Sequence, residues 1–174
     1  MNETKASRKI SYLLRHDEDF IYENGWAATQ SVIAEMKKKY PEFNLEVLQR
    51  IVENDEKGRY CFDESGEWIR ANQGHSAHVD VELEKKEPPE ILYHGTAQRF
   101  LDCIMKEGLN GQTRLYVHLS WNEETAVNVG KRHGKPIVLK INAQKMQEDG
   151  YEFFESVNHV WLTKKVPVQY IEMM

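Results

Sequence analysis

The sequence has few of the features that mark disulfide-bonded or membrane proteins. Its two cysteines, Cys61 and Cys103, form no Cys-x-x-Cys pair and lie in apolar surroundings, which predicts buried free thiols in a reducing compartment. No apolar run reaches the roughly 20 residues that a membrane-spanning helix needs. The N-terminal MNETKASRK lacks the apolar core of a secretory signal. We therefore expect a cytoplasmic protein with no membrane association.

Excess positive charge and the common nucleotide-binding loops are also missing. The 174 residues include 23 Lys and Arg against 28 Asp and Glu, a formal net charge of −5. This balance argues against a protein that coats nucleic acid non-specifically, so any nucleic-acid contact should be small and focused. Neither GxGxxG nor GxxxxGK[ST] occurs, so we expect neither a Rossmann nor a P-loop site.

The composition changes sharply between Val79 and Glu90, where charged residues lead to Pro88-Pro89. Two adjacent prolines favour extended backbone, so residues 81–90 are predicted to be an acidic linker between lobes 1–80 and 91–174. In the first lobe, apolar periodicity predicts a helix that ends near Arg15-His16, a second helix capped by Thr29 and a third after Asn44. The strands RYCF and EWIRA follow as a hairpin. This is the order of a winged-helix domain, a module that contacts either nucleic acid or protein.

The second lobe alternates strands with helices. The strands are predicted at ILYHGT, RLYVHLS and PIVLKIN, and the helices at AQRFLDCIMKEGL, NEETAVNVGKRHG and AQKMQEDG. Asn122 is placed to cap the second of these helices. The fold class predicted for the whole chain is therefore α+β.

Three arginines stand at the edges of predicted elements. Arg15 ends the first helix, Arg59 opens the hairpin and Arg114 opens the YVHLS strand. Converging guanidinium groups can hold a phosphate dianion, each charge-assisted bond contributing about 1.5–3 kcal/mol. Adjacent His16 would add a titratable donor. Spacing alone leaves open the alternative that these are separate surface arginines in ordinary ion pairs.

Two histidines lie on predicted strands, His94 in YHGT and His118 in VHLS. Gly95 follows His94 and would let a ligand approach the backbone, and Thr96 could cap the next helix. His118 and Ser120 fall on the strand face opposite the flanking apolar residues. Such side chains could bind ribose hydroxyls or phosphates, or they could be hydrogen-bonded core histidines.

The loop IRANQGHS follows the hairpin and is dense in hydrogen-bonding groups, which indicates either a polar contact surface or an ordinary solvated loop. It contains Arg70, Asn72, Gln73 and His75. His75 and His78 are three residues apart, but no Cys, Asp or third His nearby would complete a ligand set, so no metal is expected.

Several segments together resemble the RNA 2′-phosphotransferase family, of the KptA type. They are SYLLRH, Gly25-Trp26, KGRYCF, IRANQGHS, LYHGT, RLYVHLS, VGKRHGKP and NHVWLT, and they cover nearly the whole chain in order. The resemblance implies an N-terminal winged-helix RNA-binding lobe, a C-terminal NAD-binding lobe of the ADP-ribosyltransferase type, and an active site between them. We further expect a monomer that needs no metal.

Members of this family remove an internal RNA 2′-phosphate with NAD as co-substrate. The resemblance implies that the 2′-phosphate first attacks C1″ of the nicotinamide ribose and expels nicotinamide. The ribose O2″ then attacks phosphorus, which gives 2′-OH RNA and ADP-ribose 1″,2″-cyclic phosphate.

The family's site residues carry over by motif. The implied catalytic set is Arg15, His16, Arg59 and Arg114, and the implied NAD-binding set is His94, Gly95, Thr96, His118 and Ser120. In such an enzyme the loop residues Arg70, Asn72, Gln73 and His75 are expected to contact RNA. His159 departs from the usual Asn-Gly-Val-Trp motif at the glycine, a position that needs backbone room.

Two other functions fit the same sequence. An ADP-ribosyltransferase that modifies nucleic-acid ends or protein would stop after the first step, and it would not need the arginines of the first lobe. A non-catalytic winged-helix module would show no dependence on NAD, and the net charge of −5 speaks against it.

Overall fold

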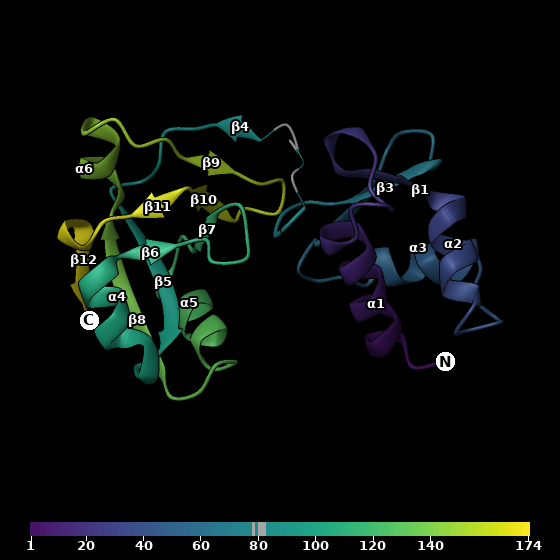
Figure 1. The fold of residues 1–174 in the computed structure, drawn as a ribbon, viewed down its shortest axis with the longest axis horizontal. Helices are drawn as coiled ribbons and strands as arrows, with labels where there is room; N and C mark the ends of the chain where they lie inside the picture. Colours follow the sequence, from purple (N-terminus) through teal and green to yellow (C-terminus); the bar gives the residue numbers. More distant parts are fainter. Residues whose placement is uncertain (78, 80–82) are drawn as a thin grey trace. The chain divides into compact units, whose positions relative to one another are not determined.

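The computed structural model describes residues 1–77, 79 and 83–174 (Figure 1). The chain divides into two compact units, Met1–Glu82 and Leu83–Met174, each with its own hydrophobic core. The fold is mixed α/β, with six α-helices in the described part of the chain and several small sheets. None of the described helices is long and apolar enough to cross a membrane.

The first unit combines helices with a small antiparallel sheet. Its helices are α1 (Glu3–His16), η1 (Glu23–Gly25), α2 (Thr29–Lys37) and α3 (Leu45–Glu53). The strands β1 (Trp26–Ala28), β2 (Tyr60–Phe62) and β3 (Trp68–Ala71) pair in the order β1-β3-β2. The three helices and the β2–β3 hairpin are confirmed, whereas β1 was not predicted.

Local capping chemistry explains where two helices of this unit begin. Asn2 and Asn44 accept hydrogen bonds from the backbone amides of Lys5 and Val47, which satisfies a free N–H at the start of α1 and of α3. The prediction that Thr29 caps α2 is wrong. Thr29 is the first helical residue, and its hydroxyl donates instead to the carbonyl of Gly66.

The second unit is built around a long antiparallel ladder between β5 (Ile91–Ala97) and β8 (Pro136–Asn142), and β12 (Ile171–Met173) pairs with the other edge of β8. A second sheet has the order β4-β9-β10-β7, and β11 pairs with β6. Its strands are β4 (Glu84–Lys85), β7 (Val117–Leu119), β9 (Phe154–Glu155) and β10 (Trp161–Thr163); the separate pair is β6 (Leu109–Asn110) and β11 (Lys165–Val166).

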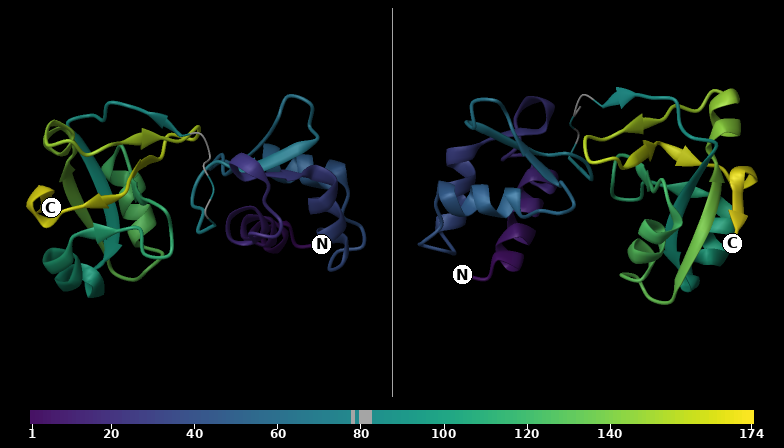
Figure 2. Two further views of the ribbon diagram at one scale, coloured as in Figure 1. Left: turned by 45° about the horizontal axis from the view of Figure 1, so that its top comes forward. Right: turned by 180° about the vertical axis from the view of Figure 1, so that it is seen from behind.

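The helices of the second unit lie beside these ladders, as the two views of Figure 2 show. They are η2 (Gln98–Phe100), α4 (Leu101–Glu107), α5 (Glu123–Gly130), α6 (Ala143–Glu148) and η3 (Val168–Tyr170). Helix α5 packs against both β5 and β8. The Asn122 side chain accepts from the amide of Thr125, which confirms the predicted cap of α5.

Helix α5 comes so close to β5 that two glycines are required. A Cβ on Gly95 would stand 1.7 Å from the carbonyl oxygen of Ala126, and a Cβ on Gly130 would stand 2.6 Å from that of Thr96. The structure thus gives Gly95 a packing reason, whereas the ligand approach expected from the sequence stays a prediction. Thr96 lies buried within β5, so the prediction that it caps a helix is wrong.

Two further sequence predictions need revision. Part of the segment predicted as a linker lies in the second unit, because Glu84–Lys85 forms β4 and the Lys86 amide donates to the carbonyl of Phe153. Cys103 is exposed on α4 and Cys61 is half-buried, so neither thiol is buried as predicted.

His159 occupies the left-handed backbone region, with φ at +59°, where a glycine has no steric cost. We expect His159→Gly to raise the free energy of unfolding by about 0.5–1 kcal/mol, because relief of this strain outweighs loss of the exposed hydrogen bond between His159 Nδ1 and Glu155. Urea unfolding checks the change. Gln112→Gly, at another exposed residue with φ of +57°, is a matched control that should show a gain of similar size. A clear loss of stability in His159→Gly would contradict this account.

Candidate active site

Helix α1 presents a stripe of polar side chains. Ser7, Ser11 and Arg15 are spaced four residues apart and therefore share one face of the helix. Arg15 Nη1 donates to Ser11 Oγ at 2.9 Å, which holds the guanidinium against this face. Arg15 and His16 form the last turn, where cations complement the helix dipole.

Arg59 reaches the same face of α1 from the loop that precedes β2. Its Nη2 lies 3.5 Å from Ser7 Oγ, one turn along the stripe from the serine that holds Arg15. Two guanidinium nitrogens bond to Asp55 Oδ1, Nε at 2.9 Å and Nη2 at 2.7 Å. The structure thus brings two of the predicted catalytic arginines to one helix face.

Asp55 fixes the orientation of Arg59. Its side chain is only 3% exposed. Burial raises the pKa of the Asp55 carboxyl, but hydrogen bonds from the side chain and backbone of Arg59 lower it more, and the net pKa lies below the usual range. A charged Asp55 therefore accompanies Arg59 at neutral pH.

The loop after β3 closes over the end of α1. The amides of Ser76 and Ala77 donate to the carbonyl of Arg15 at 3.0 and 3.2 Å. His16 Nδ1 and Ser76 Oγ are hydrogen-bonded at 2.7 Å. Gly74 has φ of +86°, and a Cβ there would lie 3.6 Å from Arg15 Nε. The loop thus runs directly against the Arg15 guanidinium.

The four loop residues predicted to contact RNA differ in exposure. Arg70 is half-buried, with its guanidinium 4.4 Å from the centre of the Trp26 ring, and Gln73 is also half-buried. Asn72 is buried; its Nδ2 donates to the carbonyl of Gly58 at 2.6 Å, and its amide donates to the carbonyl of Arg59 at 2.9 Å. Asn72 therefore supports the backbone that carries Arg59.

His75 is 4% exposed and stands among cations. Burial, together with the charges of Arg15, His16 and Arg70, lowers the pKa of His75 to about 4, against an opposing hydrogen bond from its ring to the carbonyl of Leu14. At neutral pH it is therefore an uncharged group that packs against the end of α1. We call Arg15, His16, Arg59, Arg70 and His75 the first-unit cluster.

The neutral state of His75 makes stability depend on pH. In the unfolded chain its imidazole has an ordinary pKa near 6.5, so as the pH falls from 6.5 towards 4 the unfolded state binds a proton that the folded state does not. Folding stability should therefore fall by about 3 kcal/mol over this window because of His75 alone.

His75→Asn tests this dependence, since the Asn amide can donate to the Leu14 carbonyl but does not titrate. We expect the variant to be less stable at pH 7 and to have a flatter profile between pH 6.5 and 4, measured by urea unfolding at each pH. Parallel profiles for the two proteins would contradict a buried neutral His75.

In the second unit, a single backbone bridge joins β5 to the end of β7. Tyr93 and Ser120 exchange amide-to-carbonyl hydrogen bonds of 2.9 and 2.8 Å. His94 Nδ1 donates to the carbonyl of His118 at 3.1 Å, which leaves Nε2 of a neutral His94 as an acceptor. Burial lowers the pKa of His94, more than that hydrogen bond raises it. The structure thus brings His94, His118 and Ser120 together.

Arg114 does not open β7 as the sequence predicts. That strand begins at Val117, and Arg114 lies in the preceding turn, where its amide donates to the carbonyl of Gly111 at 2.9 Å. Its side chain is exposed.

Sequence reasoning missed Asp55 and the two serines that hold the arginines. The signal for the serines was present as a spacing of four residues between Ser7, Ser11 and Arg15. Among residues 1–77, 79 and 83–174, no group of three His, Cys, Asp or Glu side chains could hold a metal ion. His78, the other half of the histidine pair considered above, lies outside the described residues.

Comparison with known proteins adds to this geometry. Residues 1–165 match the family described as RNA 2'-phosphotransferase, Tpt1 / KptA family. A probable RNA 2'-phosphotransferase of Acaryochloris marina is 49% identical over 169 residues, covering 95% of this chain and 93% of the relative. Proteins described in the same words from Pectobacterium atrosepticum and Fusobacterium nucleatum are 44% and 46% identical, covering 97% and 98% of this chain and the same shares of the relatives. This chain therefore belongs to the RNA 2'-phosphotransferase, Tpt1/KptA family.

Proposed function

We propose that this protein is an NAD-dependent RNA 2′-phosphotransferase of the cytoplasm, which removes an internal 2′-phosphate from RNA. The products are 2′-OH RNA, nicotinamide and ADP-ribose 1″,2″-cyclic phosphate. The observation that carries the proposal is the placement of Arg15 and Arg59 on one face of α1 with His16 beside them, in a chain whose relatives are named for this activity.

We assign the phosphate to Arg15, His16, Arg59 and Arg114. Guanidinium groups form paired hydrogen bonds with phosphate oxygens and stay charged at any physiological pH. Asp55 and Ser11 restrict the motion of Arg59 and Arg15, so less side-chain entropy is lost when phosphate binds. For Arg114, in the exposed turn before β7, this assignment rests on the family motif alone.

NAD supplies the ribose that accepts the phosphate, and its nicotinamide is the leaving group. The residues near the bridge between β5 and β7 fit such a co-substrate, because a neutral, half-buried His94, a buried Thr96 and the Ser120 hydroxyl offer acceptors and donors for sugar hydroxyls. We assign NAD binding to these three residues and His118, with Gly95 providing the close approach of α5 that shapes the strand.

The residues of the first unit act at the phosphate in both chemical steps. In the first step they orient one phosphate oxygen as a nucleophile, a task of positioning. In the second step negative charge builds up around phosphorus, and the fixed guanidinium groups stabilise that charge more than they stabilise the ground state. His16 donates a proton to the RNA 2′-oxygen as the bond from that oxygen to phosphorus breaks.

We assign RNA binding to the first unit and NAD binding to the second. Three helices followed by the β2–β3 hairpin support a winged-helix lobe that binds RNA. The alternation of strands and helices in the second unit, together with its histidine-bearing strands, supports an ADP-ribosyltransferase type of NAD lobe. The expected partners are therefore one RNA and one NAD, with the protein as a monomer.

Incubation of an RNA bearing one internal 2′-phosphate, with and without NAD, tests the proposal. Recovery of 2′-OH RNA and nicotinamide only with NAD is the expected result. A stable ADP-ribosylated RNA or protein as the end product would instead indicate simple ADP-ribosyl transfer, and dephosphorylation without NAD would overturn the proposal.

A further inference from the structure

A groove of about 520 Å³ opens on the first unit outside the residues assigned to catalysis. Three aromatic and three polar residues line it: Tyr22, Trp26, Trp68, Glu23, Asn24 and Asp63. We call it the aromatic groove. It lies beside the edge strand β1 and the start of the central strand β3, with the Tyr22–Asn24 loop along one side.

The aromatic rings are unusually exposed for their size. Tyr22 is 58% exposed and Trp68 is 38% exposed, and their rings meet edge to face at a centroid distance of 5.7 Å. This contact lets each ring restrict the other while leaving flat apolar surface open to water. Exposed, preorganised aromatic surface is the feature on which unpaired nucleobases stack.

The groove borders the first-unit cluster through Arg70. On one side the Arg70 guanidinium lies 4.4 Å from the centre of the Trp26 ring, a residue that pairs with Arg70 across the β1–β3 ladder. The charge of Arg70 also lowers the pKa of His75, as do the charges of Arg15 and His16. Arg70, which also lies 3.4 Å from the carbonyl of Asn24, thus joins the groove to the cluster that we assign to the phosphate.

The polar rim selects a base over a phosphate. Glu23 and Asp63 place carboxylates at the groove, which repel a phosphate but accept hydrogen bonds from amino groups on a base edge. Hydrogen bonds from Ser65 and from the Trp68 amide keep the pKa of Asp63 below its usual range, so it is charged at neutral pH. The occupant that fits is flat, aromatic and rich in donors.

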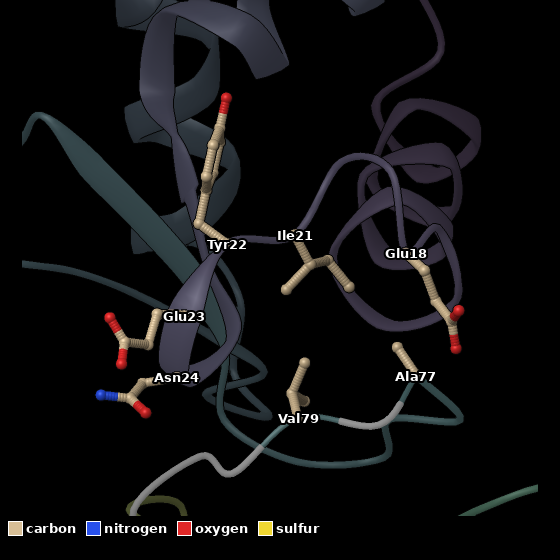
Figure 3. A pocket seen from close by; sticks show the side chains of 7 residues that line it. All are labelled: Glu18, Ile21, Tyr22, Glu23, Asn24, Ala77 and Val79. Atoms are coloured by element: carbon tan, nitrogen blue, oxygen red, sulfur yellow. The ribbon is translucent and has the colours of Figure 1, made fainter.

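A second hollow, of about 530 Å³, lies on the other side of the Tyr22–Asn24 loop and is lined also by Glu18, Ile21, Ala77 and Val79 (Figure 3). In that view the Tyr22 ring is directed away from Val79, and the remaining apolar side chains are aliphatic. Tyr22 is the one aromatic residue that lines this hollow, whereas Trp26 and Trp68 also line the aromatic groove, which therefore offers more surface for stacking.

We propose that the aromatic groove is a subsite for one unpaired nucleobase of the RNA, on a nucleotide flanking the 2′-phosphate. The base stacks on the Trp68 ring, which the edge-to-face contact with Tyr22 holds in place, and its amino group donates to the carboxylates of the rim. The inference rests on the proposed function, since it takes RNA as the substrate.

The test combines changes in RNA and in protein. We would prepare a short single-stranded RNA with one internal 2′-phosphate and adenine on both sides, and two versions in which the 5′ or the 3′ adenine is abasic. Affinities are measured by fluorescence anisotropy of end-labelled RNA for wild type, Trp68→Ala and Tyr22→Ala. Phe100→Ala is the control, because Phe100 is an exposed aromatic residue of the second unit, 41% exposed.

For wild type and Phe100→Ala, we expect one of the abasic RNAs to bind about 10-fold more weakly than the adenine RNA. Trp68→Ala should bind the adenine RNA about 10-fold more weakly than wild type does, with no further loss for the abasic RNA. Tyr22→Ala, at a more exposed ring, should show the same coupling if Trp68→Ala does not fold.

The subsite would be wrong if the abasic RNAs lost the same factor of affinity in all four proteins. It would also be wrong if wild type bound adenine RNA and abasic RNA equally. Equal binding of the two RNAs by wild type is also expected if the groove instead binds a cationic side chain of a protein partner. Failure of wild type to convert the adenine RNA with NAD would count against the proposed function, whereas normal conversion without coupling would count against the groove alone.

Discussion

Arg15→Ala is expected to slow the formation of 2′-OH RNA by about 100- to 1,000-fold while nicotinamide release is much less affected. Arg15 lies in the last turn of α1, and Ser11 and the loop around Gly74 hold its guanidinium. Charge accumulates at phosphorus mainly in the second step, so the loss of a fixed guanidinium should fall on that step. We expect ADP-ribosylated RNA to accumulate. Rapid quenching of the reaction, with separation of ADP-ribosylated RNA from 2′-OH RNA, measures this accumulation.

Two variants make this result specific. Arg15→Lys keeps the charge but loses the planar fork, and we expect it to recover only part of the rate. Arg50→Ala removes another arginine of the first unit, one that pairs with Glu3 at the surface, and should leave both steps unchanged. Wild-type turnover in Arg15→Ala, or equal losses in both steps, would contradict the role given to Arg15.

Gly95→Ala is expected to destabilise the protein by more than about 3 kcal/mol, a large part of the stability of an ordinary domain. The new Cβ would lie 1.7 Å from the carbonyl oxygen of Ala126 and 2.5 Å from its carbonyl carbon. These are backbone atoms of α5, so no side-chain rotation can relieve the overlap, and the helix must move away from β5 and β8.

Gly150→Ala is the matched control for this substitution. Gly150 has φ of +94°, and a Cβ there meets no atom within 4 Å, so the variant carries backbone strain without overlap. We expect it to cost about 1 kcal/mol in urea unfolding. The packing role of Gly95 would be wrong if Gly95→Ala were as stable as Gly150→Ala and only bound NAD more weakly. In that case the approach of the ligand would be the reason for a glycine at this position.

The parts of the fold that depend on local chemistry could be predicted. Asn44 and Asn122 precede helices because an Asn side chain satisfies a free amide of the first turn, and that signal is contained in a few neighbouring residues. The β2–β3 hairpin likewise follows from alternation around a turn. Strand β1 was missed because its three residues become a strand only through pairing with β3, about 40 residues further along the chain.

The candidate site also has features that could be predicted from the sequence and features that could not. Family motifs pointed to Arg15, Arg59, His94 and His118, but apart from the four-residue spacing of Ser11 and Arg15 no pattern along the chain showed what holds them. The contact of Arg59 with Ser7 joins residues 52 apart in sequence, and Asn72 reaches the carbonyl of Gly58 across 14 residues. A loop dense in polar residues reads as an exposed surface, whereas Asn72 and His75 are buried because the backbone of the Arg59 loop and of α1 supplies their partners.

The fate of the phosphate tests the central claim most directly. An RNA with a radiolabelled internal 2′-phosphate would be incubated with the protein and NAD, and the labelled small products would be separated. The account predicts that all released label is found in ADP-ribose 1″,2″-cyclic phosphate, in amounts equal to the nicotinamide formed. Release of the label as inorganic phosphate, or its retention in RNA while nicotinamide accumulates, would contradict the transfer of the 2′-phosphate to NAD.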